Sequence, residues 1–175
     1  MIASEASGVL LSAISQRKRI VMPCGASIPP AAFLKAAEQA GPILILLPEG
    51  NAAMDLAFFL NCESPRRAVG IDERTRPSER RGILENLLNE NRKILCVSAA
   101  SLRKWFVEEM GKKRDLFSAV FILAAERCSP FSMTFSIDAA KGAMLARDWS
   151  HLPMVAVVNS LSMEVIEEAG RVLAA

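Results

Sequence analysis

Short runs of consecutive apolar residues alternate with longer stretches of helical periodicity along the chain. Six runs are rich in Val, Ile and Leu and span about five residues each, at 19–23, 43–47, 67–71, 93–97, 119–124 and 154–158. A strand that is apolar at nearly every position is typical of a parallel sheet whose two faces are both covered. The pattern therefore predicts six buried strands.

Seven stretches with helical spacing lie around these strands, at 4–16, 29–40, 51–61, 77–91, 99–111, 137–149 and 162–174. Proline suits a first helical turn, and Pro29, Pro30 and Pro77 stand at expected helix starts. Gly41 and Gly111 stand where C-terminal caps are expected. Because strand and helix alternate, we expect right-handed βαβ units in a single α/β domain over residues 1–175. This domain would be a three-layer sandwich with a mostly parallel sheet of about six strands.

Composition narrows the class of protein. The chain has 175 residues, 51% hydrophobic and 23% charged, which excludes intrinsic disorder and provides a core without disulfides or metal. No apolar run approaches the roughly 18 residues of a membrane span, and the first residues have no basic start, so we expect no membrane association. The four cysteines form no closely spaced pair, so we expect reduced thiols, a cytoplasmic location and no metal site.

The segments that follow the strands are the place to look for function, because ligands of open parallel sheets bind outside the carboxyl ends of the strands. Five segments there read RIVMPCGAS at 19–27, ILLPEGN at 45–51, LCVSAASL at 95–102, FILAAERC at 121–128 and LPMVAVVNS at 152–160. In order and spacing they resemble the segments VMPTGGGKS, SPLISLMKDQ, YIAPERL, the strand carrying DEAHC, and LPFMALTAT. These belong to the first RecA-like lobe of RecQ-family, superfamily-2 DNA helicases, and the resemblance covers about residues 8–174.

The resemblance places two ATP-handling motifs, and this chain departs from both. The nucleotide loop would cover Cys24, Gly25, Ala26, Ser27, Ile28 and Pro29, with its lysine at Ile28 and its hydroxyl residue at Pro29. The DEAH acids would fall at Ala124 and Ala125, followed by Glu126 and Arg127. A phosphate loop needs the lysine for the terminal phosphates and the hydroxyl for magnesium, and the acids hold magnesium and activate water. We therefore expect no ATP hydrolysis and no cofactor.

The resemblance then implies a helicase-like domain that has lost ATP binding and serves as a non-catalytic binding or assembly module, with a link to DNA metabolism. Its partner would be a protein or a weakly and non-specifically bound nucleic acid, and the chain could form an oligomer. The alternative is a divergent nucleotide-binding enzyme, or a fragment of a RecQ-like ATP-dependent DNA helicase. A Rossmann-type oxidoreductase is disfavoured, because no GxGxxG follows the first strand.

Arginines supply the other candidate contacts. Arg66, Arg67, Arg80 and Arg81 belong to a basic cluster that could follow a phosphate backbone. Acids are interleaved with them, however, and the net charge of +2 does not by itself indicate a nucleic-acid partner, so a solvated, salt-bridged face is the simpler interpretation. His151 and Cys24 are most simply structural. The backbone amides of the turn at 24–27 could still bind an anion at a helix start.

One further expectation concerns the surface at the strand ends. It reads Cys24, Ala26, Ile28, Ala99, Ala100, Ala124 and Ala125, which are small or apolar residues where a helicase lobe has polar ones. We therefore expect this edge to be buried, either by the chain's own loop at 127–136 or by another protein chain.

Overall fold

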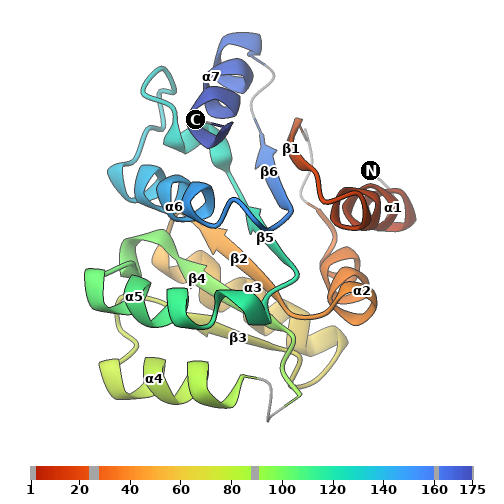
Figure 1. Ribbon diagram of the computed structural model, residues 1–175, viewed down its shortest axis with the longest axis vertical. Coiled ribbons are helices and arrows are strands. Elements are labelled where there is room, and N and C mark those ends of the chain that lie inside the picture. Colours follow the sequence, from red (N-terminus) through yellow and green to blue (C-terminus); the bar gives the residue numbers. More distant parts are fainter. Residues whose placement is uncertain (1–2, 24–27, 88–90, 160–161, 175) are drawn as a thin grey trace.

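The computed structural model of the chain describes residues 3–23, 28–87, 91–159 and 162–174. Its centre is a sheet of six strands that are all parallel. The strands lie in the order β1-β6-β5-β2-β4-β3 (Figure 1). Their bounds are β1 Arg19–Pro23, β2 Ile43–Leu47, β3 Ala68–Ile71, β4 Ile94–Ser98, β5 Ala119–Ile122 and β6 Met154–Val158. The six predicted strands are confirmed, and the sheet is parallel throughout.

Two apolar cores lie on opposite faces of the sheet. Leu44 and Leu46 of β2 point into one core, whereas Ile43, Ile45 and Leu47 point into the other. This alternation has the two-residue period of a strand, and both sets are buried because both faces are covered. The chain therefore folds as a three-layer α/β sandwich, the arrangement of a RecA-like domain.

In the described part of the chain, seven helices supply the two outer layers (Figure 1). One face is covered by α1 Ala3–Ser15, α2 Pro30–Ala40 and α3 Gly50–Glu63. The other is covered by α4 Pro77–Asn86, α5 Lys104–Lys112, α6 Ile137–Asp148 and α7 Met163–Ala174. Within the part of the chain that the structure describes, no helix is long and apolar enough to cross a bilayer.

The helix boundaries follow the sequence with three exceptions. Gly41 ends α2 in a left-handed conformation, with φ of 105°, as predicted. Gly111 does not cap α5, which continues to Lys112. The helix expected at 99–111 is divided into the short 3-10 helix η1 (Ala99–Ser101) and α5, because the backbone leaves helical geometry at Leu102 and Arg103, with ψ of 82° and 152°. The helix expected at 77–91 ends at Asn86.

The edge strand β3 is closed at its first residue by a side chain. Asn61 Nδ2 donates to the carbonyl of Ala68, and the N–H of Ala68 donates to Asn61 Oδ1, both at 2.9 Å. The amide of Asn61 therefore takes the place that a neighbouring strand would occupy beside Ala68.

Strand β5 ends earlier than expected because Ala124 turns the chain. Its φ of 50° and ψ of 47° lie in the left-handed region, which disfavours residues other than glycine and asparagine. The short 3-10 helix η3 (Ala125–Cys128) begins directly after it.

Removing this backbone strain should stabilise the protein. We expect Ala124→Gly to raise the free energy of unfolding by up to about 1 kcal/mol, because glycine adopts φ above zero without the steric cost. Ala100→Gly, in η1, is the control and should lower it, since no positive φ offsets the added chain entropy there. Urea unfolding measures both, and a destabilised Ala124→Gly would contradict the assignment of strain.

Candidate functional site

The carboxyl ends of β1, β6, β5 and β2 lie side by side, and a pocket of about 370 Å³ opens there. Residues from segments far apart in sequence line it, because the parallel strands all end at this edge. Its walls are mainly apolar, and the described residues that line it are Ile28, Phe33, Leu47, Pro48, Glu49, Ala52, Leu56, Leu123, Ala124, Arg127, Val157 and Asn159. We call it the strand-end pocket.

The described nucleotide-loop positions, Ile28 and Pro29, supply little that could hold a phosphate. Cys24, Gly25, Ala26 and Ser27 lie outside the described residues. Ile28 is buried in the core beneath α1 to α3, with 7% of its surface exposed. Pro29 caps α2 and Pro30 begins it, so neither offers a backbone N–H, and the N–H of Ala32 already donates to the Pro29 carbonyl at 2.9 Å. The start of α2 therefore has few donors for an anion.

At the DEAH positions, the two alanines pack against neighbouring residues and the glutamate bonds to the backbone of another strand end. Ala125 is buried and Ala124 is half-buried at the pocket wall. Glu126, the one acid of the segment, accepts a hydrogen bond from the backbone N–H of Asn159 at 3.0 Å. Its carboxylate thus braces the ends of β5 and β6 against each other.

Arg127 joins two segments of the chain beside the pocket. Its Nη1 donates to Glu49 Oε1 at 2.5 Å, and its Nε donates to the carbonyl of Thr134 at 3.1 Å. The Arg127 side chain is 24% exposed and that of Glu49 is 67% exposed. The two opposite charges of the pocket lining therefore neutralise each other, and Arg127 also holds the following loop.

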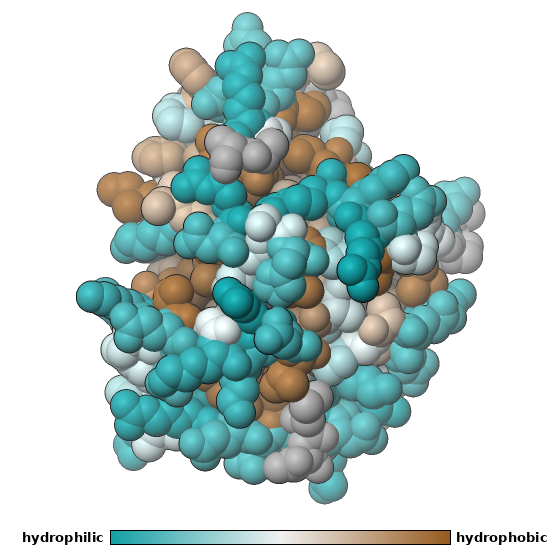
Figure 2. Space-filling model, in the orientation of Figure 1, coloured by the Kyte–Doolittle hydropathy of each residue, from teal (hydrophilic) through white to brown (hydrophobic). Residues whose placement is uncertain are grey.

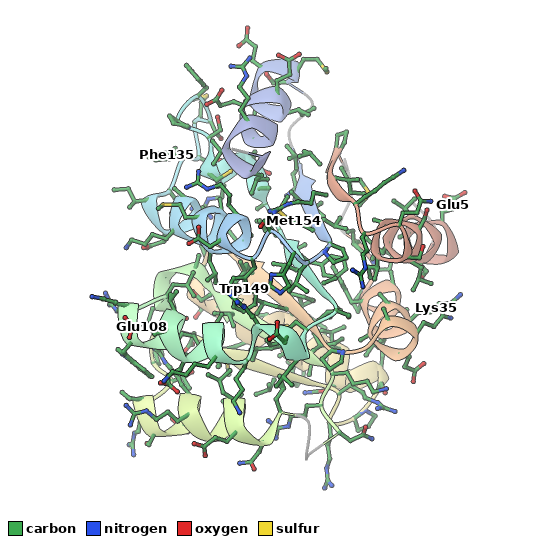
Figure 3. All side chains as sticks on the ribbon, in the orientation of Figure 1. Glu5, Lys35, Glu108, Phe135, Trp149 and Met154 are labelled. Carbon is green, nitrogen blue, oxygen red and sulfur yellow. The ribbon has the colours of Figure 1, made fainter. Side chains whose placement is uncertain are left out.

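The loop at 129–136 covers the edge only in part. Cys128 and Ser129 are buried, but Phe131, Met133 and Phe135 are exposed. Figure 3 shows Phe135 at the upper left of the molecule. Figure 2 shows hydrophobic surface at the upper left, where Figure 1 places this loop and α6. The expected burial holds for Ile28, Ala99 and Ala125, whereas Ala100 and Ala124 are half-buried beside the open pocket. The aromatic side chains of the loop do not seal it.

The four candidate arginines do not form one surface. Arg66 and Arg67 precede β3 at its amino end, whereas Arg80 and Arg81 belong to α4, and Arg80 reaches the carboxyl end of β3. Arg67 also lies 3.8 Å from Glu38. The sequence placed the four together because they are close along the chain.

Arg80 belongs to the fold rather than to a binding surface. It is 5% exposed, and its guanidinium donates to the carbonyls of Asp72, Thr75 and Ser101 at 2.8–2.9 Å. It also lies over the rings of Phe106 and Trp105. Burial, with a contribution from the charge of Arg103, lowers the pKa of Arg80. Arg81 remains exposed, stacked over Trp105.

The remaining titratable candidates have structural surroundings. His151 lies 3.6 Å from Asp115, on the surface. Burial raises the pKa of the Cys96 thiol, and it raises that of Cys128 to about 11, so neither is an activated nucleophile. Among residues 3–23, 28–87, 91–159 and 162–174, no three His, Cys, Asp or Glu side chains gather as metal ligands would.

Sequence reasoning missed Glu49 and Asn159 as members of the site. Both fall in segments singled out as strand ends, but nothing in a sequence indicates that Glu49 meets Arg127, which is 78 positions away. The usable signal was an acid and a base at the ends of two strands that turn out to be neighbours, β2 and β5.

Comparison with known protein families and with curated proteins finds no match to this chain.

The structural role of Arg80 predicts a stability effect. Arg80→Ala should lower the free energy of unfolding by about 3 kcal/mol or more, because it leaves several buried carbonyls without donors. Arg81→Ala, one residue further on the exposed side, should cost less than about 1 kcal/mol. Chemical denaturation compares the two, and similar small losses would show that the Arg80 hydrogen bonds contribute little.

Proposed function

We propose that the chain is a non-catalytic RecA-like domain, similar to the first lobe of RecQ-family helicases, that neither binds nor hydrolyses ATP. It would act as a binding or assembly module. The observation that carries this proposal is that the acidic side chains around the strand-end pocket are already bonded to other groups of the protein. Glu126 is bonded to the Asn159 backbone, and Glu49 is paired with Arg127.

Phosphoryl transfer makes demands that this edge does not meet. The transferred group and its magnesium need a cation at the terminal phosphates and carboxylates on the metal, and single groups of this kind contribute several kcal/mol each. Methyl groups of Ala124 and Ala125 stand at the acid positions, and Ile28 stands at the lysine position in the core. The sole acid of the DEAH-like segment braces two strands instead.

The arrangement of the strands supports the RecA-like part of the proposal. The resemblance requires the loop after β1 and the segment after β5 to face one shared site. β6 lies between β1 and β5, and Ile28, Ala124, Arg127 and Asn159 all line the same pocket. The segments compared with helicase motifs thus meet at one edge of the sheet.

A divergent nucleotide-binding enzyme, or a fragment of a RecQ-like helicase, is the alternative. The observation that favours it is the pocket itself, whose volume of about 370 Å³ lies in the range of small-ligand sites. The same measurement of ATP binding separates the two proposals.

We expect millimolar ATP with magnesium to leave the melting temperature unchanged and to release no phosphate. A ligand at 100 times its Kd adds about 2.7 kcal/mol, which for a chain of this size raises Tm by about 5–10 °C. Differential scanning fluorimetry and a phosphate-release assay test both parts. Magnesium-dependent phosphate release that disappears in Arg127→Ala would overturn the proposal.

Nucleic acid remains a proposed partner, and the structure divides the candidate contacts into two groups. Of the candidates, Arg81 is exposed near the carboxyl end of the sheet, over the partly exposed ring of Trp105. Arg103, which the sequence did not single out, is exposed and close enough to affect the pKa of Arg80. Arg66 and Arg67 lie at the other end.

We expect any binding of single-stranded DNA to be weak, independent of sequence and steeply salt-dependent, because only separated arginines are available. Each lost phosphate contact should reduce the slope of log K against log salt by about 0.7. Fluorescence anisotropy on Arg81→Ser/Arg103→Ser and on Arg66→Ser/Arg67→Ser shows which group contributes. Tight binding at physiological salt that survives in both double variants would mean that neither group is the contact surface.

A further inference from the structure

The strand-end pocket has an apolar interior. Its floor consists of side chains at most 7% exposed, namely Ile28, Phe33, Leu47 and Val157. Its walls come from half-buried side chains of α3 and of the segments after β2 and β5, namely Pro48, Ala52, Leu56, Leu123 and Ala124. Apolar side chains gathered in a concave surface gain free energy when a ligand removes them from water.

Among the described lining residues, the polar ones lie at the ends of β2, β5 and β6. They are Glu49, Arg127 and Asn159. Arg127 is already paired with Glu49, so an anionic ligand would have to displace that carboxylate or enter beside it. A cationic ligand would compete with Arg127 in the same way. The described lining therefore offers hydrogen-bonding atoms without an uncompensated charge.

Among the described residues, those around the pocket offer little to a phosphate. Pro29 and Pro30 remove two of the amide donors at the start of α2, and Glu126 is bonded to the Asn159 backbone. An ionised phosphate in the apolar interior would lose its hydration without gaining a cation, and transferring such a charge out of water is strongly unfavourable.

We propose that the strand-end pocket binds an uncharged small molecule that has an apolar body and a single hydrogen-bonding end. The inference rests on the proposed function, since it assumes that the nucleotide is no longer the ligand of this edge. The apolar body contacts Ala52, Leu56 and Leu123, and the polar end lies toward Asn159 and the Glu49–Arg127 pair. The volume of about 370 Å³ admits a molecule of two or three fused or linked rings.

The test uses two fluorescent probes with the same aromatic body on the full chain. Phenylnaphthylamine is uncharged and has one N–H, and anilinonaphthalene sulfonate adds one negative charge. Both gain fluorescence when they leave water. We expect saturable, equimolar binding of the neutral probe and at least about tenfold weaker binding of the sulfonate, because Arg127, the cation among the described lining residues, is paired with Glu49.

Variants locate the binding. Ala52→Phe fills the pocket and should weaken the neutral probe at least about tenfold. Ala31→Phe makes the same change on the exposed side of α2, outside the lining, and should have no effect. Phe131→Ser, in the exposed loop, should also have none. Should Ala52→Phe fail to fold, Leu56→Gln places a polar group on the same wall and should weaken the probe as well.

Charge selectivity has its own variant. Glu49→Gln releases Arg127 from its ion pair, so it should strengthen binding of the sulfonate and leave the neutral probe nearly unchanged.

Three outcomes would overturn the inference: no binding of the neutral probe, equal or tighter binding of the sulfonate, or binding that disappears in Phe131→Ser. Each can occur while ATP still fails to bind, in which case the proposed loss of ATP binding stands. ATP that displaces the neutral probe would overturn both.

Discussion

Burial of every central strand on both faces is the constraint on which this structure depends. A parallel strand satisfies its backbone only through its neighbours, and its side chains must alternate between two apolar layers. In β2 this requirement is met by five consecutive aliphatic residues whose side chains divide between the two cores. Because all six strands run in one direction, their carboxyl ends lie at one edge of the sheet. Segments that are far apart in the sequence therefore come into contact at that edge.

The charged groups at that edge have structural partners. One carboxylate accepts a hydrogen bond from the Asn159 backbone, and one guanidinium joins the end of β2 to the loop after η3. Small apolar side chains fill the positions between them. These side chains hold the strand ends together, so the described lining of the pocket is shaped mainly by packing.

The sequence predicted the strands well because their signal is local and strong. Runs such as Ile43–Leu47 are apolar at all five positions, and no other element explains them. The break between η1 and α5 was missed because it falls at Leu102 and Arg103, and neither residue type signals the end of a helix in the sequence. Arg80 was read as part of a charged face because its neighbours are charged, and its burial against Phe106 depends on how α4 packs on α5. The pairing of Glu49 with Arg127 is a property of strand order, which a single sequence does not reveal.

The hydrogen bonds between Asn61 and Ala68 bear on how copies of the protein can meet. A sheet grows by strand addition, and a free edge invites domain swapping and fibrous aggregation. At β3, Ala68 is occupied by Asn61, and beyond the strand the N–H of Asp72 donates to Thr75 Oγ1 while its carbonyl accepts from Arg80. A second copy arriving at this border finds both ends of the ladder already taken. Strand addition on this side would therefore have to break these bonds at both ends of β3, a cost that contacts between side-chain surfaces do not carry.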